Sequence, residues 1–286
     1  MSDILTRILS SMRFRILSSI RSDGLSKTLV RCFRYPFRHD PDPQFNKVMR
    51  YGTPAQIFSE IYEKNNYWGG GTESASGGGS TLHYTANLRR HLPQLFKDFS
   101  ITSIYDAPCG DFNWMRFVIQ QSDIIYYGAD IVPVMIDKIQ KQYGTPKVRF
   151  KTANITLDEF PKVDLWFCRD CLFHLSNRDI ILALRNFLAS GTPFVFTTTH
   201  LKDTAFENVD IRTGGFRHID LFSAPYFFPR EVLARIADWV EPWPPREMCL
   251  WTREQVASAV QRMEAIISPA GGRWFRSFRV SAMERT

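Results

Sequence analysis

The fold is decided by two stretches, SITSIYDAPCGDF at residues 100–112 and DIIYYGAD at residues 123–130. Each contains a short apolar run that ends in an acid, Asp106 in the first stretch and Asp130 in the second. Runs of this length, bounded by polar residues and turn formers, are typical of strands buried on both faces of a sheet. We therefore predict two such strands, with an acid at the carboxyl end of each.

The same pattern continues to residue 200. Further strands are predicted in KVRFKTA (147–153), KVDLWFC (162–168) and TPFVFTTT (192–199), and helices at residues 113–121, 132–143 and 177–188. This alternation predicts an α/β fold with a doubly wound, mostly parallel sheet. Ligands bind such sheets at the carboxyl ends of the strands. The pattern weakens after residue 200 and resumes at residues 229–240, 247–252 and 253–266.

Composition limits the class of protein. The chain has 286 residues, 44% of them hydrophobic, which suits one packed core and excludes disordered or collagen-like architectures. Residues 1–40 hold 8 Lys and Arg against 3 Asp, so 28 basic and 26 acidic residues remain for the rest. No nucleic-acid partner is expected, because phosphate contacts need a concentrated basic face. Five cysteines are too few for a disulfide framework and indicate reduced thiols in the cytoplasm.

Residues 1–22 have the pattern of a basic amphipathic helix, since isoleucine or methionine recurs every four residues from Ile4 to Ile20. Three interpretations stay open: a helix that docks on the core or a partner, a peripheral anchor at the inner face of the membrane, or a cleaved transit peptide. We assign residues 1–53 to this extension and an irregular, proline-containing connector. Residues 54–286 are assigned to a single domain.

A glycine-rich stretch, GGGTESASGGGST, spans residues 69–81. It is either a flexible linker or a loop that covers a ligand. Before it, the sequence has the periodicity of a helix through Ile57 and Ile61. After it, TLHYTANLRRHL predicts a helix with Ser80 or Thr81 as its N-cap.

The turn after the first predicted strand indicates the kind of ligand. Gly110 is its sole glycine, so the GxGxxG fingerprint of dinucleotide-binding folds is absent. A carboxylate at Asp106 would repel a pyrophosphate but attract a ligand with a positive, hydrogen-bond-donating end. Asp130 is placed to accept hydrogen bonds from ribose hydroxyls. S-adenosylmethionine has an ammonium and a sulfonium, so it fits this turn better than NAD does.

The turn resembles that of class I S-adenosylmethionine-dependent methyltransferases. Asp106, Cys109 and Gly110 match the family's first motif, D-x-G-x-G-x-G, whereas Pro108 and Phe112 replace its outer glycines. One branch, often encoded in polysaccharide biosynthesis clusters, resembles the chain over about residues 55–230 through IFSEIYEKNNYWGGGTESASGGGST, DAPCGDFNWM, GADIV, DLWFCRDCLFHLS and TGGFRHIDL. The motifs DxPCGDxxWM and RDxLxHL are specific to that branch.

This resemblance implies a seven-stranded, Rossmann-like methyltransferase sheet, with the cofactor half at about residues 101–200 and an acceptor-side loop at about 200–228. Asp106 and Gly110 would line the methionine end of S-adenosylmethionine. Asn154 would either accept a hydrogen bond from the adenine amine or cap its own loop. The cofactor-binding residues implied are Asp106, Pro108, Cys109, Gly110, Asp130, Ile131, Asn154 and Arg169.

Catalytic candidates follow the fourth predicted strand, whose end faces the methyl group and the acceptor in this family. Asp170 and His174 could share one helical face as an orienting carboxylate and a general base. Alternatively, Asp170 pairs with Arg169 or caps the helix, and His174 is a structural, half-buried histidine. His200 and His218 are reserve candidates for the base.

Residues 200–229 are too long and too rich in polar and aromatic side chains for a minimal connection. They form either a carbohydrate pocket or a surface loop whose aromatic residues cover the domain edge. Cys168 and Cys171 are not expected to bind a metal, because no second ligand pair accompanies them.

The resemblance therefore implies a methyltransferase that O-methylates a sugar, a glycan or another small polar acceptor. An RNA methyltransferase and a catalytically inactive, cofactor-binding interaction protein are the alternatives.

Overall fold

The computed structural model describes residues 43–64, 71, 73–201 and 206–267. The amphipathic helix predicted at residues 1–22 lies outside these ranges. The chain divides into two compact units, Met1–Arg50 and Tyr51–Thr286. Helix α2 (Pro43–Tyr51) corrects the prediction of an irregular connector here. Pro43 is the first residue of that helix, where no intrahelical hydrogen-bond donor is needed, so it starts the helix instead of breaking it.

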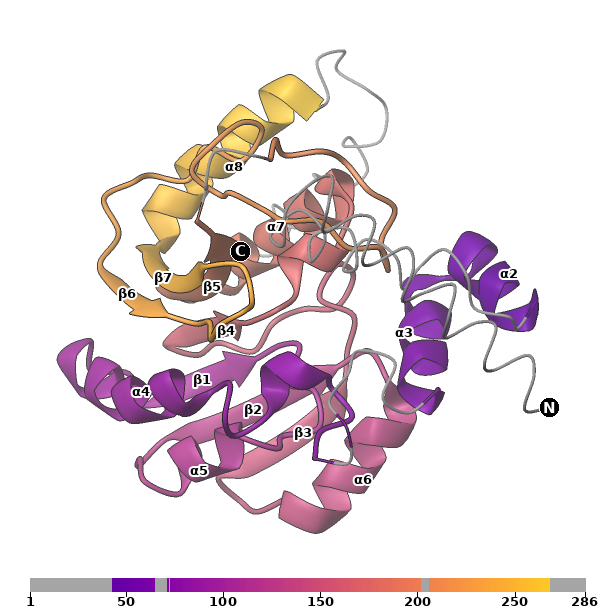
Figure 1. The fold of residues 1–286 in the computed structure, drawn as a ribbon. Coiled ribbons are helices and arrows are strands. Elements are labelled where there is room, and N and C mark those ends of the chain that lie inside the picture. The colour runs from indigo at the N-terminus through magenta and orange to yellow at the C-terminus, as the bar shows by residue number, and fades with distance from the viewer. Residues whose placement is uncertain (1–42, 65–70, 72, 202–205, 268–286) are drawn as a thin grey trace, which may run out of the picture. The chain divides into compact units, whose positions relative to one another are not determined.

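The described residues of the second unit form a seven-stranded sheet (Figure 1). Its strands are β1 (Ser103–Asp106), β2 (Ile125–Asp130), β3 (Val148–Thr152), β4 (Leu165–Cys168), β5 (Phe194–His200), β6 (Ala234–Ala237) and β7 (Arg246–Thr252). They lie in the order β3-β2-β1-β4-β5-β7-β6. Strands β1 to β5 pair in parallel, whereas β7 is antiparallel to both β5 and β6. The mostly parallel sheet and the five strands predicted before residue 200 are confirmed.

Helices cover both faces of this sheet, as a doubly wound fold requires (Figure 1). Helices α7 (Asn177–Ser190) and α8 (Arg253–Ile267) pack together on one face. The other face carries α4 (Ala86–Asp98), α5 (Met115–Ile119) and α6 (Pro133–Tyr143). The three helices predicted between strands therefore exist, although α5 is shorter than its sequence pattern.

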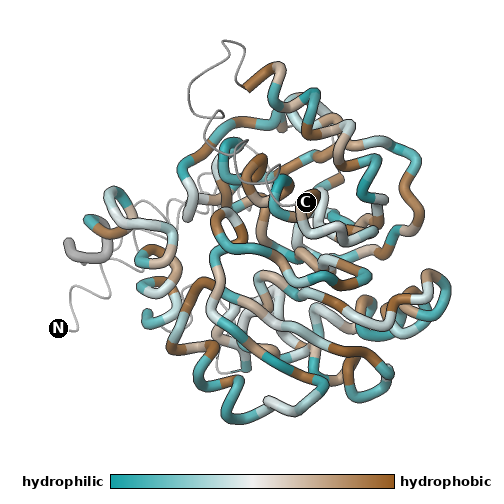
Figure 2. The backbone as a smooth tube through the Cα atoms, turned by 180° about the vertical axis from the view of Figure 1, so that it is seen from behind, coloured by the Kyte–Doolittle hydropathy of each residue, from teal (hydrophilic) through white to brown (hydrophobic). Residues whose placement is uncertain are grey.

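Neighbouring strand residues point to opposite faces and join two separate cores. In β4, Trp166 packs on Phe187 of α7, with ring centroids 5.6 Å apart. Leu165 and Phe167 belong to the core on the other face, beside α4 and α5. Because both faces are covered, β4 is an unbroken apolar run without polar alternation. The helices have one face toward the solvent and one toward the core, so hydrophilic and hydrophobic colours alternate along them in Figure 2.

Helix α4 begins later than its sequence predicts. Its N-cap is Thr85, and neither Ser80 nor Thr81 caps it, which corrects that prediction. Ser80 ends a short 3-10 turn, η1 (Gly78–Ser80), and the Thr81 hydroxyl donates to the Gly78 carbonyl at 3.0 Å. The capping side chain is therefore used by the preceding turn. No helix among the described residues is long and apolar enough to cross a bilayer.

Candidate active site

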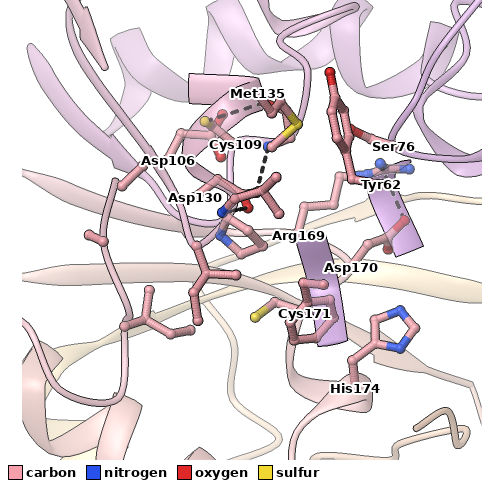
Figure 3. Close-up of a pocket in the computed structure, with 18 of the residues that line it drawn as sticks. Tyr62, Ser76, Asp106, Cys109, Asp130, Met135, Arg169, Asp170, Cys171 and His174 are labelled. Atoms are coloured by element: carbon pink, nitrogen blue, oxygen red, sulfur yellow. Dashed lines mark hydrogen bonds and ion pairs between the residues drawn. The ribbon is translucent and has the colours of Figure 1, made fainter. Parts of the chain in front are cut away.

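A cavity lies at the carboxyl ends of β1 to β4, the edge at which the sequence predicts a ligand. All the residues assigned to cofactor binding line it: Asp106, Pro108, Cys109, Gly110, Asp130, Ile131, Asn154 and Arg169. Asp170 and His174 line it as well. Figure 3 shows Asp106, Cys109 and Asp130 toward one end of the cavity and Asp170 and His174 toward the other. The two groups of predicted residues thus share one site.

Asp106 ends β1 and is 3% exposed. Its Oδ2 accepts a hydrogen bond from the Tyr126 hydroxyl at 2.6 Å. Among the described residues, none of the ion pairs includes Asp106. Burial raises the pKa of Asp106 to about 8, although the Tyr126 hydrogen bond and the charge of Arg169 oppose the shift. A buried carboxyl in this state is stabilised in its ionised form by a cationic group on a ligand.

The turn after β1 is held against β2. The Cys109 amide donates to the Ala129 carbonyl at 2.8 Å, and the Gly110 amide donates to Asp130 Oδ2 at 3.2 Å. Gly110 has a φ of 57°, in the left-handed region that glycine adopts without strain. Asp130 Oδ1 accepts from the Val132 amide at 3.1 Å. Burial raises the pKa of Asp130 to about 6 against the effect of these backbone bonds, so the carboxylate is mostly ionised at pH 7.

Asn154 follows β3 and caps its own loop. Its Oδ1 accepts from the amide and the hydroxyl of Thr156, at 3.0 and 2.8 Å. Its backbone amide donates to Asp158 Oδ2 at 2.7 Å. Both lone pairs of the amide oxygen are therefore used within the loop. These contacts are those of the loop-capping interpretation, and the hydrogen bond from an adenine amine stays a prediction.

The described part of the glycine-rich stretch is a loop anchored on the turn after β1. The Ser74 hydroxyl and the Ala75 amide donate to Asp111 Oδ2 at 2.9 and 2.8 Å. The Asp111 amide donates in turn to Ser76 Oγ at 2.8 Å. A Cβ atom on Gly110 would lie 2.4 Å from the same Oγ, so the two segments are in direct contact. Ala75 and Ser76 line the cavity, which favours a loop that covers a ligand over a flexible linker.

Helix α3 (Pro54–Glu63) forms a further wall that the sequence did not assign to the site. Ile57 and Ile61 are buried, as the periodicity predicts. Phe58 and Tyr62, each one residue further along, line the cavity. Because residues four apart lie on one helical face, the same four-residue spacing builds both the buried stripe and an aromatic stripe beside it. The four-residue spacing of Phe58 and Tyr62 was the feature of the sequence that could have predicted this wall.

His174 is held by a distant backbone carbonyl. It ends the 3-10 turn η2 (Leu172–His174), and its Nδ1 lies 2.7 Å from the Gly215 carbonyl oxygen. That oxygen can only accept, so in the neutral ring Nδ1 carries the proton and Nε2 is the basic nitrogen. Asp170 precedes the turn with a φ of 54°, outside any helix. The predicted helical face shared by Asp170 and His174 is therefore wrong, and Gly215 orients the imidazole.

The charges around His174 act in both directions. Burial lowers the pKa of His174 to about 4. The Gly215 carbonyl and the Asp170 carboxylate oppose this shift, whereas Arg217 and Arg246 reinforce it. The imidazole is consequently neutral at pH 7, and it is a weaker base than a solvent-exposed histidine.

The alternative pairing of Asp170 with Arg169 is observed, as part of a larger network. Arg169 Nη1 lies 3.4 Å from Asp170 Oδ2, and Arg246 Nη2 lies 2.9 Å from the same oxygen. Arg169 also donates to the Asp238 carboxylate through Nε and Nη2, both at 2.9 Å. Sequence reasoning missed Asp238 and Arg246, since both come from the antiparallel edge of the sheet. The local signal was an arginine at the start of the apolar run REMCLWT.

His200 and His218 do not line this cavity. Their rings stack with centroids 4.7 Å apart, and the Ile219 amide donates to His200 Nδ1 at 3.2 Å. The structure thus corrects their assignment as reserve bases at this site.

The predicted acceptor-side loop is mostly used for its own packing. Arg217 is buried and donates to the Leu175 carbonyl at 2.6 Å and to the Tyr226 hydroxyl at 2.7 Å. Tyr226, Phe228 and the partly buried Phe222 join the core around Trp251. Thr213 is the one described residue of this loop that lines the cavity. These contacts favour the edge-covering interpretation of the described part of the loop, and the carbohydrate pocket stays a prediction.

Within the described residues, no group of three His, Cys, Asp or Glu side chains is arranged to hold a metal ion.

No protein-family model and no curated protein matches the chain. Solved structures with the same arrangement of strands and helices do match the chain. An S-adenosylmethionine-dependent methyltransferase from Leishmania major is 13% identical, with a TM-score of 0.51 over 79% of this chain and 91% of that one. The fold is that of S-adenosylmethionine-dependent methyltransferases. This methyltransferase fold also occurs in the 1,6-didemethyltoxoflavin-N1-methyltransferase of Burkholderia thailandensis, whose structure contains 1,6-didemethyltoxoflavin and S-adenosylhomocysteine. That protein is 15% identical, with a TM-score of 0.50 over 74% of this chain and 90% of the other.

Proposed function

We propose that this protein is an S-adenosylmethionine-dependent methyltransferase that O-methylates a small hydroxylated acceptor, a sugar or a glycan. The observation that carries the proposal is one cavity with a buried carboxyl group at one end, Asp106, and an imidazole at the other, His174. A methyl transfer to oxygen needs both: a site for the charged donor and a base for the hydroxyl proton.

The residues at the β1 and β2 ends fit this cofactor. Asp106 is buried beside the cavity, and a ligand ammonium would supply a cation to it. Asp130 has its carboxylate fixed by the Gly110 and Val132 amides, and it would accept from ribose hydroxyls. S-adenosylmethionine would supply an electrophilic methyl group when bound here. The segment containing Ala75 and Ser76 would cover it and exclude water.

The chain supplies the base through His174. With Nδ1 donating to Gly215, Nε2 accepts the proton of an acceptor hydroxyl as that oxygen attacks the methyl group. The negative charge of the Asp170 carboxylate favours the imidazolium that results. Direct displacement requires alignment of the acceptor, so the wall around His174 determines which acceptors react.

The acceptor class rests on the chemistry of that wall. Phe58 and Tyr62 present aromatic surface, whereas Thr213, Asp170 and His174 present hydrogen-bonding groups. Aromatic faces combined with a few polar groups suit a hydroxylated ring. The motifs shared with a methyltransferase branch encoded near polysaccharide genes point to the same class.

The experiment is to incubate the purified protein with methyl-labelled S-adenosylmethionine and separate fractions of cell glycans, RNA and lipids. Label in the glycan fraction, lost in the His174→Gln variant, is the expected result. Label in RNA alone would replace the sugar acceptor with a nucleic acid. Cofactor binding without label in any fraction would favour a cofactor-binding protein without catalysis.

A further inference from the structure

Asp111, in the turn after β1, binds the glycine-rich stretch through its side chain and its backbone. Both oxygens of its carboxylate accept hydrogen bonds, and those on Oδ2 come from the Ser74 hydroxyl and the Ala75 amide, at 2.9 and 2.8 Å. Ser74 is 2% exposed, so its hydroxyl needs a partner within the protein. The Asp111 amide donates to Ser76 Oγ at 2.8 Å. One residue of the turn therefore binds three consecutive residues of the glycine-rich stretch.

The part of this stretch that forms a wall of the cavity is closed on itself, and we call residues 73–82 the wall segment. Glu73 Oε1 accepts from the Leu82 amide, which joins the two ends of the segment. Toward β4, the Gly79 carbonyl accepts from Arg169 Nη2 at 2.7 Å. The wall segment is thus attached on both sides, to the turn after β1 and to the end of β4.

The wall segment contacts the cavity directly, whereas Asp111 does not. Ala75, Ser76 and Ser80 line the cavity, and Asp111 is absent from its lining. Gly110 lines it as well, and a Cβ atom on Gly110 would lie 2.4 Å from Ser76 Oγ and 3.0 Å from Ser76 Cβ. A ligand that approaches the Gly110 backbone consequently has the Ser76 side chain as its neighbour. Asp111 can act on such a ligand through the position of the wall segment.

We propose that Asp111 is a positioning residue, which holds the wall segment against the turn after β1 and so retains the cofactor in the cavity. The proposal rests on the proposed function, because the ligand retained is S-adenosylmethionine. A carboxylate suits this role, since its two oxygens accept from one hydroxyl and two backbone amides at the same time. The cofactor leaves when the wall segment gives up these contacts, so they slow its dissociation.

The test compares variants of the full chain by two measurements. Stopped-flow fluorescence gives the association and dissociation rate constants of S-adenosylmethionine. Hydrogen exchange, followed by mass spectrometry, reports the opening of residues 73–82 in the ligand-free protein. Asp111→Ala removes every contact of the carboxylate, and Ser74→Ala removes one of them, which keeps the proposal testable if Asp111→Ala does not fold. Circular dichroism and thermal melting check the folding of each variant.

Asp164→Ala is the matched control. The Asp164 carboxylate also accepts from hydroxyls and backbone amides, but at the opposite end of β1, and it does not line the cavity. Its loss therefore removes the same kind of hydrogen bonds without touching the wall segment.

We expect Asp111→Ala to raise the dissociation rate constant about tenfold, as for the loss of hydrogen bonds to a charged group, without lowering the association rate constant. Ser74→Ala should raise it by a smaller factor. Exchange in residues 73–82 should be faster in both variants. Asp164→Ala should change neither the rate constants nor the exchange of the wall segment.

Two results would overturn the proposal. One is a wild-type dissociation rate constant in Asp111→Ala, because the wall segment would then not retain the cofactor. The other is an equal increase in Asp111→Ala and Asp164→Ala, which would indicate a general loss of stability. Absence of binding to the wild type would instead refute the proposed function, and the exchange rates, which need no ligand, would still decide whether Asp111 holds the wall segment.

Discussion

The two ends of the cavity are built from different kinds of contact. At the cofactor end, Gly110 and Asp130 are joined by a hydrogen bond across 20 residues, within one strand, helix, strand unit. At the acceptor end, His174 is held by Gly215 across 41 residues, and Asp170 by Arg246 across 76. The cofactor end is thus a local structure, whereas the acceptor end is assembled by tertiary contacts.

This difference predicts a separation of roles. Changes at the cofactor end should weaken cofactor binding, and changes at the acceptor end should slow turnover while cofactor affinity stays the same. The variants below test this separation, and any residue that affects both quantities equally would break it.

The largest effect is expected at His174. Loss of a positioned general base costs about 10² to 10⁴ in rate, so His174→Gln should lower turnover by that factor with an unchanged dissociation constant for the cofactor. His218→Gln is the control, because His218 does not line the cavity. Turnover near the wild-type value in His174→Gln would show that this histidine is structural.

The next effect is expected at Asp130. Hydrogen bonds to a charged group contribute about 1.5 to 3 kcal/mol, so Asp130→Ala should weaken cofactor binding roughly tenfold to a hundredfold. Asp123→Ala is the matched control, since Asp123 lies before the same strand and pairs with Lys147 on the surface. Equal affinities for both variants would remove Asp130 from the cofactor site.

The pH dependence of cofactor binding tests Asp106. Its pKa of about 8 means that the free protein holds this carboxyl mostly protonated at pH 7, and an ammonium partner must displace the proton. Affinity should therefore rise with pH up to about 8, by at most about tenfold per unit, with proton release detected by calorimetry in two buffers. Asp130, with a pKa of about 6, is already mostly ionised at pH 7, so it contributes little to the rise between pH 7 and 8. Asp106→Asn should abolish the rise, and a wild-type affinity independent of pH would contradict the assignment.

The smallest effect is expected at Asn154. Because its amide oxygen caps its own loop, Asn154→Ala should lower the free energy of unfolding by about 0.5 to 1.5 kcal/mol and change cofactor affinity less than about threefold. Asn154→Asp keeps an acceptor for Thr156 and should restore stability. A loss of cofactor affinity above tenfold without a change in melting temperature would instead indicate that Asn154 binds the adenine.

The contrast between local and tertiary contacts also explains how much of the fold and of the site could be predicted from the sequence. Strands β1, β2, β4 and β5 were predictable because buried parallel strands are short, largely apolar runs, and the acids at the ends of β1 and β2 mark one edge of the sheet. Strand β3, VRFKT, has an exposed polar residue on each side of Phe150 and was predicted from its β-branched and aromatic residues. Strand β6 has the mixed sequence ARIA with a half-buried pattern and gave no such signal. The N-cap of α4 was misplaced because Thr81 serves the preceding turn.

At the site, the residues predicted to bind the cofactor line one cavity, and those at the ends of β1 and β2 could be placed together because they belong to one local motif. The pairing of Asp170 with Arg169 was one of the predicted alternatives. The partner of His174 and the second partner of Asp170 were not predictable, since Gly215 contributes only a backbone carbonyl, which any residue could supply, and Arg246 comes from the antiparallel edge of the sheet. Arg217 belongs to the loop for which a carbohydrate pocket was one of two interpretations, but its guanidinium is used inside the loop, because a buried guanidinium must find partners where it lies.

Calorimetry of the folded wild-type chain with S-adenosylmethionine tests the central claim most directly, because every assignment at the β1 and β2 ends depends on this ligand. We predict saturable binding of one molecule per chain, also with S-adenosylhomocysteine, weakened in Asp130→Ala and unchanged in His174→Gln. Absence of both binding heat and thermal stabilisation in the folded wild type at millimolar cofactor would contradict the account.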